Sequence, residues 1–164
     1  MRSWGSRQWS CEATSGVTLA AMGSEVEQEL DDRWWLGLRK RALESVDVHE
    51  FVVVLNFAGG SVLSIEAAAT VRAVSAPGTE TAVVTRMADG TVWTSEVLMS
   101  LVGQQLLVSV GFKDGALRLV FESGLMLDVP HDEQYEAWQL TGVSGRRWVS
   151  LPGGGPATFP GGPS

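Results

Sequence analysis

Two stretches of the sequence repeat one pattern of alternating apolar residues at a constant offset. The first, DVHEFVVVLNFAGGSVLSIEA, begins at Asp47, and the second, GFKDGALRLVFESGLMLDVPH, begins at Gly111. Apolar residues at every second position bury one face of an antiparallel strand pair. The aligned pairs are Val53 with Leu117, Leu55 with Leu119, Phe57 with Phe121, Gly60 with Gly124, Leu63 with Leu127, and Ile65 with Val129. Each copy is therefore expected to form two strands joined by a tight turn at the glycine.

A third strand is expected before each pair, over residues 44–48 in the first copy and 105–112 in the second. Asp114-Gly115 is a strong hairpin signal for the second copy, and His49-Glu50 is a weaker one at the equivalent place. The sequence thus predicts two related three-stranded meanders, at about residues 37–66 and 103–130. Chance similarity between two alternating segments is the alternative.

The fold class expected from this pattern is mainly β (α+β), with antiparallel meanders in an internal two-fold repeat and a closed or nearly closed barrel as one possible arrangement. Between the copies we expect a hairpin from Thr81 that turns at Asp89-Gly90, then a short helix over residues 96–102. The segment EVEQELDDRWWL is a candidate second helix. After the second meander, YEAWQLTG and RRWVSL indicate two more strands around the turn VSG.

The expected organisation is one β-rich domain over residues 31–151. Residues 1–30 are expected to form an N-terminal extension, with disorder and a start at Met22 as open alternatives. Residues 152–164, rich in glycine and proline, are expected to form a disordered tail.

Composition and charge exclude several classes of function. The 164 residues are 45% hydrophobic and 19% charged, which is typical of a globular protein, and the net charge is −7. Nucleic acids and anionic membranes require clustered Lys and Arg, so neither is an expected partner. The one cysteine, Cys11, excludes an internal disulfide framework and a cysteine-rich zinc site. These features favour the cytoplasm.

The stretch HDEQYEAWQLTGVSGRRWVSLPGGG, residues 131–155, concentrates the residues with chemical potential. Asp132 and Glu133 follow a proline in an expected turn, so solvated turn residues are favoured over a catalytic carboxylate pair. Glu136 lies on an expected strand, where it either faces solvent or pairs with Arg146 or Arg147 across the hairpin. We predict no catalytic residue, metal or cofactor, because only two histidines are present and no nucleophile elbow or phosphate-binding loop occurs.

Tryptophan is abundant, with seven residues in the chain. Trp138 and Trp148 fall on adjacent expected strands, where a pair in the core and an exposed recognition patch are the two interpretations. Binding residues, if this stretch forms a contact surface, are Tyr135, Glu136, Trp138, Arg146, Arg147 and Trp148.

A string of turn, core and aromatic positions is clearest in the second half of the chain: L-x-G before a strand, a D-G hairpin, F-x-x-G-x-x-L-x-V-P, then YEAW-x-L-x-G and a terminal PGG. This string resembles that of a small bacterial family known as domain of unknown function 6188. The resemblance covers about residues 37–159 and is clearest from Leu101 onward. The chain departs from the family pattern in its first half, where His49-Glu50 and Ala58-Gly59-Gly60 stand in place of Asp-Gly. The family implies no activity, so it implies no catalytic residues. The matching residues are Leu101, Gly103, Asp114, Gly115, Phe121, Gly124, Leu127, Val129, Pro130, Tyr135, Glu136, Ala137, Trp138, Leu140, Gly142, Pro152, Gly153 and Gly154.

The sequence favours a non-enzymatic protein-binding module that engages an unidentified protein partner. An immunity-type protein that blocks a basic toxin is a special case suggested by size and charge, and a regulatory partner protein is another. One alternative is a small-ligand carrier or enzyme whose pocket is lined by Trp138, Trp148 and Tyr135, with Glu136 as its polar contact. A purely structural subunit is the other. The repeat also makes a homodimer through an open edge strand an expected arrangement.

Overall fold

The computed structural model describes residues 25–73, 80–84 and 95–161. Strands dominate this part of the chain, and its single helix is short. The elements are β1 (Glu27–Glu29), β2 (Arg33–Leu36), β3 (Leu43–Val48), β4 (Val53–Phe57), β5 (Val62–Ile65), β6 (Ala69–Ala73), β7 (Glu80–Val84), α2 (Ser95–Met99), β8 (Leu106–Phe112), β9 (Leu117–Phe121), β10 (Leu125–Val129), β11 (Trp138–Thr141), β12 (Arg147–Ser150) and β13 (Pro156–Phe159).

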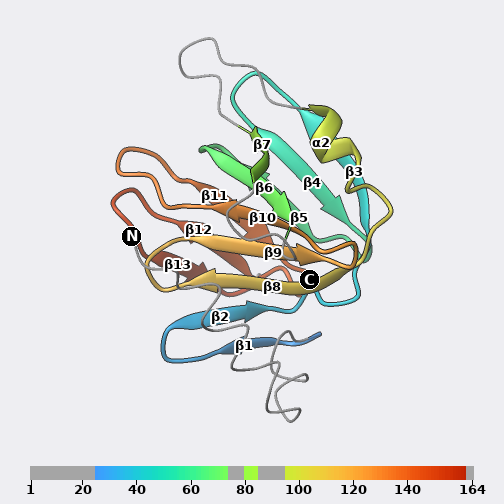
Figure 1. Cartoon of the computed structure of the whole chain (residues 1–164). Helices are drawn as coiled ribbons and strands as arrows, with labels where there is room; N and C mark the ends of the chain where they lie inside the picture. Colours follow the sequence, from blue (N-terminus) through green and yellow to red (C-terminus); the bar gives the residue numbers. More distant parts are fainter. Residues whose placement is uncertain (1–24, 74–79, 85–94, 162–164) are drawn as a thin grey trace, which may run out of the picture.

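The strands form two antiparallel sheets that pack as two layers (Figure 1). One sheet has seven strands in the order β1-β2-β8-β9-β10-β6-β7, and the other has six in the order β13-β12-β11-β5-β4-β3. The sheets keep separate edges, so the closed barrel considered from the sequence is wrong. No barrel forms because the apolar faces of the two sheets are buried against each other rather than around one closed cylinder. The mainly β fold class is confirmed.

Both predicted meanders are confirmed, and each lies in a different sheet. Strands β3-β4-β5 are neighbours in the six-stranded sheet, and β8-β9-β10 are neighbours in the seven-stranded sheet. Leu55 pairs with Leu63 in the first meander, and the equivalent Leu119 pairs with Leu127 in the second. The repeat in the sequence is therefore also a repeat in register.

The main core lies between the two meanders. Ten inward residues of β4, β5, β9 and β10 are each exposed by 1% or less. Full burial of one aliphatic or aromatic side chain contributes roughly 1.5–3 kcal/mol, so this layer is the principal source of stability. These ten are Val53, Leu55, Phe57, Leu63, Ile65, Leu117, Leu119, Phe121, Leu127 and Val129.

The segment EVEQELDDRWWL forms the hairpin β1–β2, and the expected helix is wrong. Leu30 N donates to Arg33 O at 2.8 Å and closes the turn. On a strand, adjacent residues point to opposite faces, so Trp34 contacts the main core while Trp35 lies on the other face of the sheet. At the turn, the hydrogen bond from the Arg33 guanidinium lowers the pKa of the Asp32 carboxyl.

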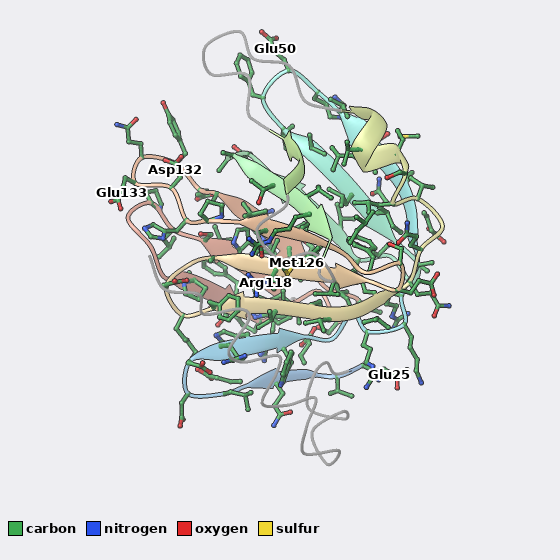
Figure 2. The ribbon with its side chains drawn as sticks, in the orientation of Figure 1. Glu25, Glu50, Arg118, Met126, Asp132 and Glu133 are labelled. Atoms are coloured by element: carbon green, nitrogen blue, oxygen red, sulfur yellow. The ribbon has the colours of Figure 1, made fainter. Side chains whose placement is uncertain are left out.

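The outer face of the seven-stranded sheet carries a second apolar cluster and a buried ion-pair triad. Figure 2 labels one member of each, Met126 and Arg118. Asp128 on β10 accepts from Arg118 Nε on β9 at 2.6 Å and pairs with Arg72 Nη2 on β6 at 3.0 Å. The Arg118 side chain is 1% exposed, so the carboxylate compensates a desolvated charge. The cluster beside the triad comprises Trp35, Val108, Val110, Phe112, Ala116, Val120 and Met126.

The ends of the domain differ from the expected boundaries. Pro156–Phe159 pair with β12 as strand β13, so the prediction of a disordered tail from residue 152 is wrong for these residues. Residues 27–29 belong to the sheet rather than to an extension. The expected helix over 96–102 is confirmed in shorter form as α2. The predicted turn at Asp89-Gly90 lies outside the described residues, as do residues 1–24.

Candidate functional site

Trp138 and Trp148 lie in the core, exposed by 1% and 0%. Both side chains point from the six-stranded sheet towards the other sheet, because they occupy inward positions of β11 and β12. Trp148 meets Trp34 of the opposite sheet edge to face, with ring centroids 6.4 Å apart. Of the two interpretations left open by the sequence, the core pair is the one that the structure supports. Neither ring is among the residues that line the groove described below.

Trp138 also joins the two sheets by a hydrogen bond. Its Nε1 donates to Gly115 O at 2.9 Å, and Ser150 Oγ donates to the same oxygen at 2.7 Å. Gly115 forms the β8–β9 turn with φ of 100°, where L side chains are strained. A Cβ at Gly111 would lie 3.1 Å from Cη2 of Trp138, so glycine lets the ring pack directly on β8.

The acidic part of the stretch forms a capped turn between β10 and β11. Asp132 Oδ1 accepts from Gln134 N at 2.8 Å and from Tyr135 N at 3.1 Å, as in an Asx turn. His131 Nε2 lies 3.2 Å from Glu133 Oε1. Tyr135 and Glu136 are exposed. Within the described ranges, Glu136 pairs with neither Arg146 nor Arg147, so both cross-strand alternatives are wrong.

The two arginines lie on opposite sides of the hairpin end. The Arg146 guanidinium is 5.9 Å from the ring centroids of both Trp34 and Trp148, and its Nε is 3.7 Å from Glu27 Oε2. Arg147 instead donates to Gln139 Oε1 at 3.2 Å and lies 5.6 Å from the Phe159 ring. The six predicted binding residues therefore divide between the core, an exposed turn and two separate surfaces.

Replacing Arg146 with alanine is expected to lower the free energy of unfolding by about 1 kcal/mol. The guanidinium covers two tryptophan rings and ties β1 to the β11–β12 turn, and such contacts contribute roughly 0.5–1 kcal/mol each when partly exposed. Arg147→Ala is the matched control, with an expected loss below about 0.5 kcal/mol because its aromatic contact, Phe159, is itself exposed. Urea denaturation followed by tryptophan fluorescence measures both. Equal losses of unfolding free energy in the two variants would contradict the stabilising role assigned to Arg146.

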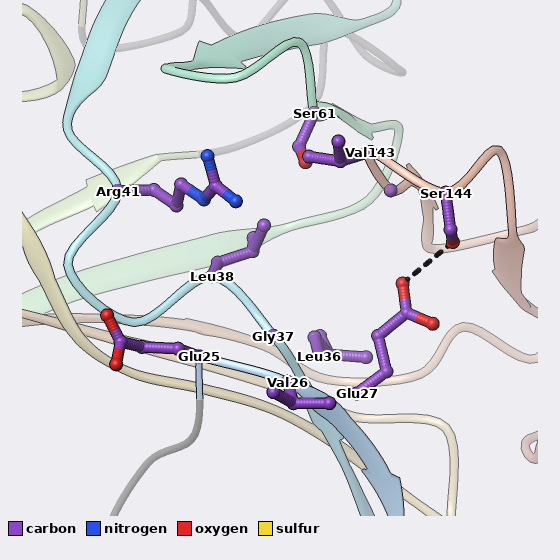
Figure 3. A pocket seen from close by; sticks show the side chains of 11 residues that line it. Glu25, Val26, Glu27, Leu36, Gly37, Leu38, Arg41, Ser61, Val143 and Ser144 are labelled. Atoms are coloured by element: carbon purple, nitrogen blue, oxygen red, sulfur yellow. Dashed lines mark hydrogen bonds between the residues drawn. The ribbon is translucent and has the colours of Figure 1, made fainter.

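A groove opens where the β1–β2 hairpin meets the β11–β12 turn (Figure 3). Its volume is about 400 Å³. The conformation of Gly37, with φ of 75°, turns the chain out of β2, and a Cβ there would lie 3.0 Å from Glu27 N. A side chain at this position would press against β1 and close that wall. The lining residues are Glu25, Val26, Glu27, Leu36, Gly37, Leu38, Arg41, Ser61, Gly142, Val143 and Ser144.

The acidic groups of the groove are already paired. Glu25 Oε1 lies 3.6 Å from Lys40 Nζ. Glu27 accepts a hydrogen bond from Ser144 Oγ at 3.1 Å, drawn dashed in Figure 3, and also pairs with Arg146. These contacts compensate the negative charge at one end of the groove. The polar groups that remain are those of Arg41 and Ser61.

Sequence reasoning missed the groove. Its lining comes from four separate segments of the chain. Two of them lie in segments with a recognisable pattern, EVEQELDDRWWL and the stretch 131–155, but neither pattern signals a groove. Spatial proximity of these segments depends on the sheet order and could not be obtained from residue spacing.

Two further properties of the described residues bear on the site. In the part of the chain that the structure describes, no three His, Cys, Asp or Glu residues come together as a group able to hold a metal ion. Nor does that part contain a helix with the length and apolar character required to cross a membrane.

Comparison with known proteins gives one match. Neither the curated proteins nor the solved structures contain a match to the chain. The model of a family of unknown function, DUF6188, matches residues 34–159, from β2 to the end of β13. The match spans both meanders and most of the sequence, so the chain belongs to the DUF6188 family.

Proposed function

We propose that the protein is a protein-binding module that holds a segment of a partner in the groove between the β1–β2 hairpin and the β11–β12 turn. The groove itself carries the proposal. It is concave, about 400 Å³ in volume, and floored by the buried apolar side chains of Leu36 and Leu38. Binding sites combine such an apolar surface with a few polar groups that fix orientation.

The rims of the groove strengthen the proposal. Val26 is 70% exposed and Val143 is 57% exposed, and they approach the groove from opposite sides (Figure 3). A single exposed valine needs no explanation, but two that flank one apolar floor extend it into a continuous surface. A bound segment would cover both valines at once and remove their apolar area from water.

The charge of the protein favours a basic partner. At −7, the chain attracts cationic proteins over long range and accelerates their association. An immunity-type or regulatory role is the form of this function that charge and size favour. The pocket lined by Trp138, Trp148 and Tyr135 is not retained as an alternative, because both tryptophans are buried in the core.

A photo-crosslinking amino acid at Val143 tests the proposal in cells that naturally make the protein. We expect a discrete adduct whose second component mass spectrometry identifies. The matched control is the same amino acid at Phe51, which is 52% exposed and lies in the β3–β4 turn. An adduct of twice the chain's mass would identify the partner as a second copy, the homodimer expected from the sequence.

Direct binding then separates the groove from incidental proximity. The crosslinked segment, made as a peptide, should bind the Val26→Asp, Val143→Asp double variant at least ~10-fold more weakly than the unaltered protein, since both changes place charge on apolar contacts. Circular dichroism checks that the variant is folded. Equal labelling at Val143 and Phe51, or equal affinity of the two proteins, would refute the proposal.

A further inference from the structure

Arg41 brings an unneutralised positive charge to the groove. Its side chain is half-buried and points into the groove from the loop before β3 (Figure 3). Within residues 25–73, 80–84 and 95–161, its guanidinium has no hydrogen-bond or ion-pair partner. Gly59 makes room for it, because a Cβ there would lie 2.2 Å from Nη1 of Arg41. Partly buried arginines are ordinarily paired, so this one is available to an anionic guest.

Ser61 supplies a second polar group on the same side. The residue is 0% exposed, and its Oγ has no hydrogen-bond partner among the residues described. A buried hydroxyl without a partner costs free energy, and such groups in native proteins call for a bound molecule or a function. The hydroxyl can donate one hydrogen bond. An acceptor that entered the groove beside Val143 would provide its partner.

We propose that the groove captures the carboxyl terminus of a partner chain. The carboxylate binds the Arg41 guanidinium and accepts from Ser61, while the terminal apolar side chain packs on Leu38 and Val143. This inference rests on the proposed function and specifies its ligand. Charge complementarity selects the carboxylate, because the acidic groups of the groove are paired and the free charge is positive.

The apolar wall selects a chain terminus over an internal acidic residue. A terminal carboxylate is attached to the same Cα as the last side chain, so a charged group and an apolar group enter together. Leu38 and Val143 line the groove alongside Arg41 and match that pair. An internal Asp or Glu would instead direct its polar backbone towards the apolar wall, which costs desolvation.

Two matched small probes test the inference by NMR titration of the full chain. N-acetyl-L-valine carries the terminal carboxylate, and N-acetyl-L-valinamide replaces it with a neutral amide. We expect the acid to shift the backbone amide signals of Gly37, Ser61 and Val143 and the Nε signal of Arg41, with an affinity at least ~10-fold above that of the amide. Arg41→Gln should abolish this preference. Arg39→Gln, a neighbouring change outside the groove, should preserve it.

The possible outcomes separate the inference from the function on which it rests. Equal affinities of acid and amide at the groove signals would overturn the carboxylate assignment and leave segment binding intact. Octanoate is the third probe. If it bound more tightly than N-acetyl-L-valine, the assignment of the ligand as a chain terminus would be wrong and a free carboxylic acid would replace it. Failure of the acid to shift any groove signal would overturn the inference, while the crosslink at Val143 tests the proposed function independently.

Discussion

Trp138→Ala is expected to lower the free energy of unfolding by about 4 kcal/mol, because tryptophan or phenylalanine truncation in a packed core costs roughly 3–5 kcal/mol. The side chain is 1% exposed and fills the space between the six-stranded sheet and Gly111 of β8. Small domains are stable by only about 5–15 kcal/mol, so this loss is a large share of the total. Urea denaturation followed by circular dichroism measures it.

Trp138→Phe separates the packing of the ring from its hydrogen bond. Phenylalanine retains an aromatic ring but loses the N–H that donates to Gly115 O. Because Ser150 Oγ still donates to that oxygen at 2.7 Å, the acceptor is not left without a partner. We expect a loss of about 1–2 kcal/mol, well below that of alanine. Similar urea midpoints for Trp138→Ala and the unaltered protein would contradict a central packing role for this ring.

Asp128→Asn is expected to lower the free energy of unfolding by about 3 kcal/mol, since removal of one partner from a buried ion pair costs roughly 3–5 kcal/mol. Asp128 shares its carboxylate between Arg118 and Arg72, so one substitution affects three neighbouring strands. The asparagine has nearly the same shape but removes the negative charge beside an Arg118 side chain that is only 1% exposed. Chemical denaturation at constant salt measures the change.

An apolar replacement of the triad provides the control. Asp128→Leu combined with Arg118→Met and Arg72→Met removes all three charges of the triad and restores apolar volume on the outer face next to Met126 and Val120. Such replacements of buried ion pairs and triads are often neutral or stabilising. We therefore expect the triple variant to be more stable than Asp128→Asn. If Asp128→Asn unfolded at the same urea concentration as the unaltered protein, the triad would not contribute to stability.

The parts of the fold that follow from local alternation could be predicted from the sequence. The meanders are such parts, because Leu55, Leu63, Leu119 and Leu127 occupy a period of two and glycine marks each turn. The helix prediction for the acidic segment before Trp34 was wrong because its polar run is compatible with a solvated helix. Pairing with β8 is what makes this segment a strand. Likewise, Pro156–Phe159 form a strand because β12 offers an edge.

The candidate site depended on information that spacing does not contain. Trp138 and Trp148 were correctly placed on adjacent strands, but their burial follows from the opposite sheet, to which Gly111 and Gly115 belong. Arg41 and Ser61 reach one groove because a turn after β4 lies beside the loop before β3. Glu136 has two arginines opposite it in the expected hairpin, and only side-chain geometry shows that it pairs with neither.

The distribution of the chain between the two sheets determines when the protein can fold during synthesis. The six-stranded sheet starts with β3-β4-β5 but is completed by β11, β12 and β13, the last strands described. The N-terminal meander therefore emerges from the ribosome before β8-β9-β10, which cover its apolar face, and long before β11, which pairs with its edge strand β5. Contacts between residues distant in sequence form slowly, and exposed strands in the interval favour aggregation. Nascent chains of this protein should depend on a ribosome-associated chaperone until β13 has left the exit tunnel.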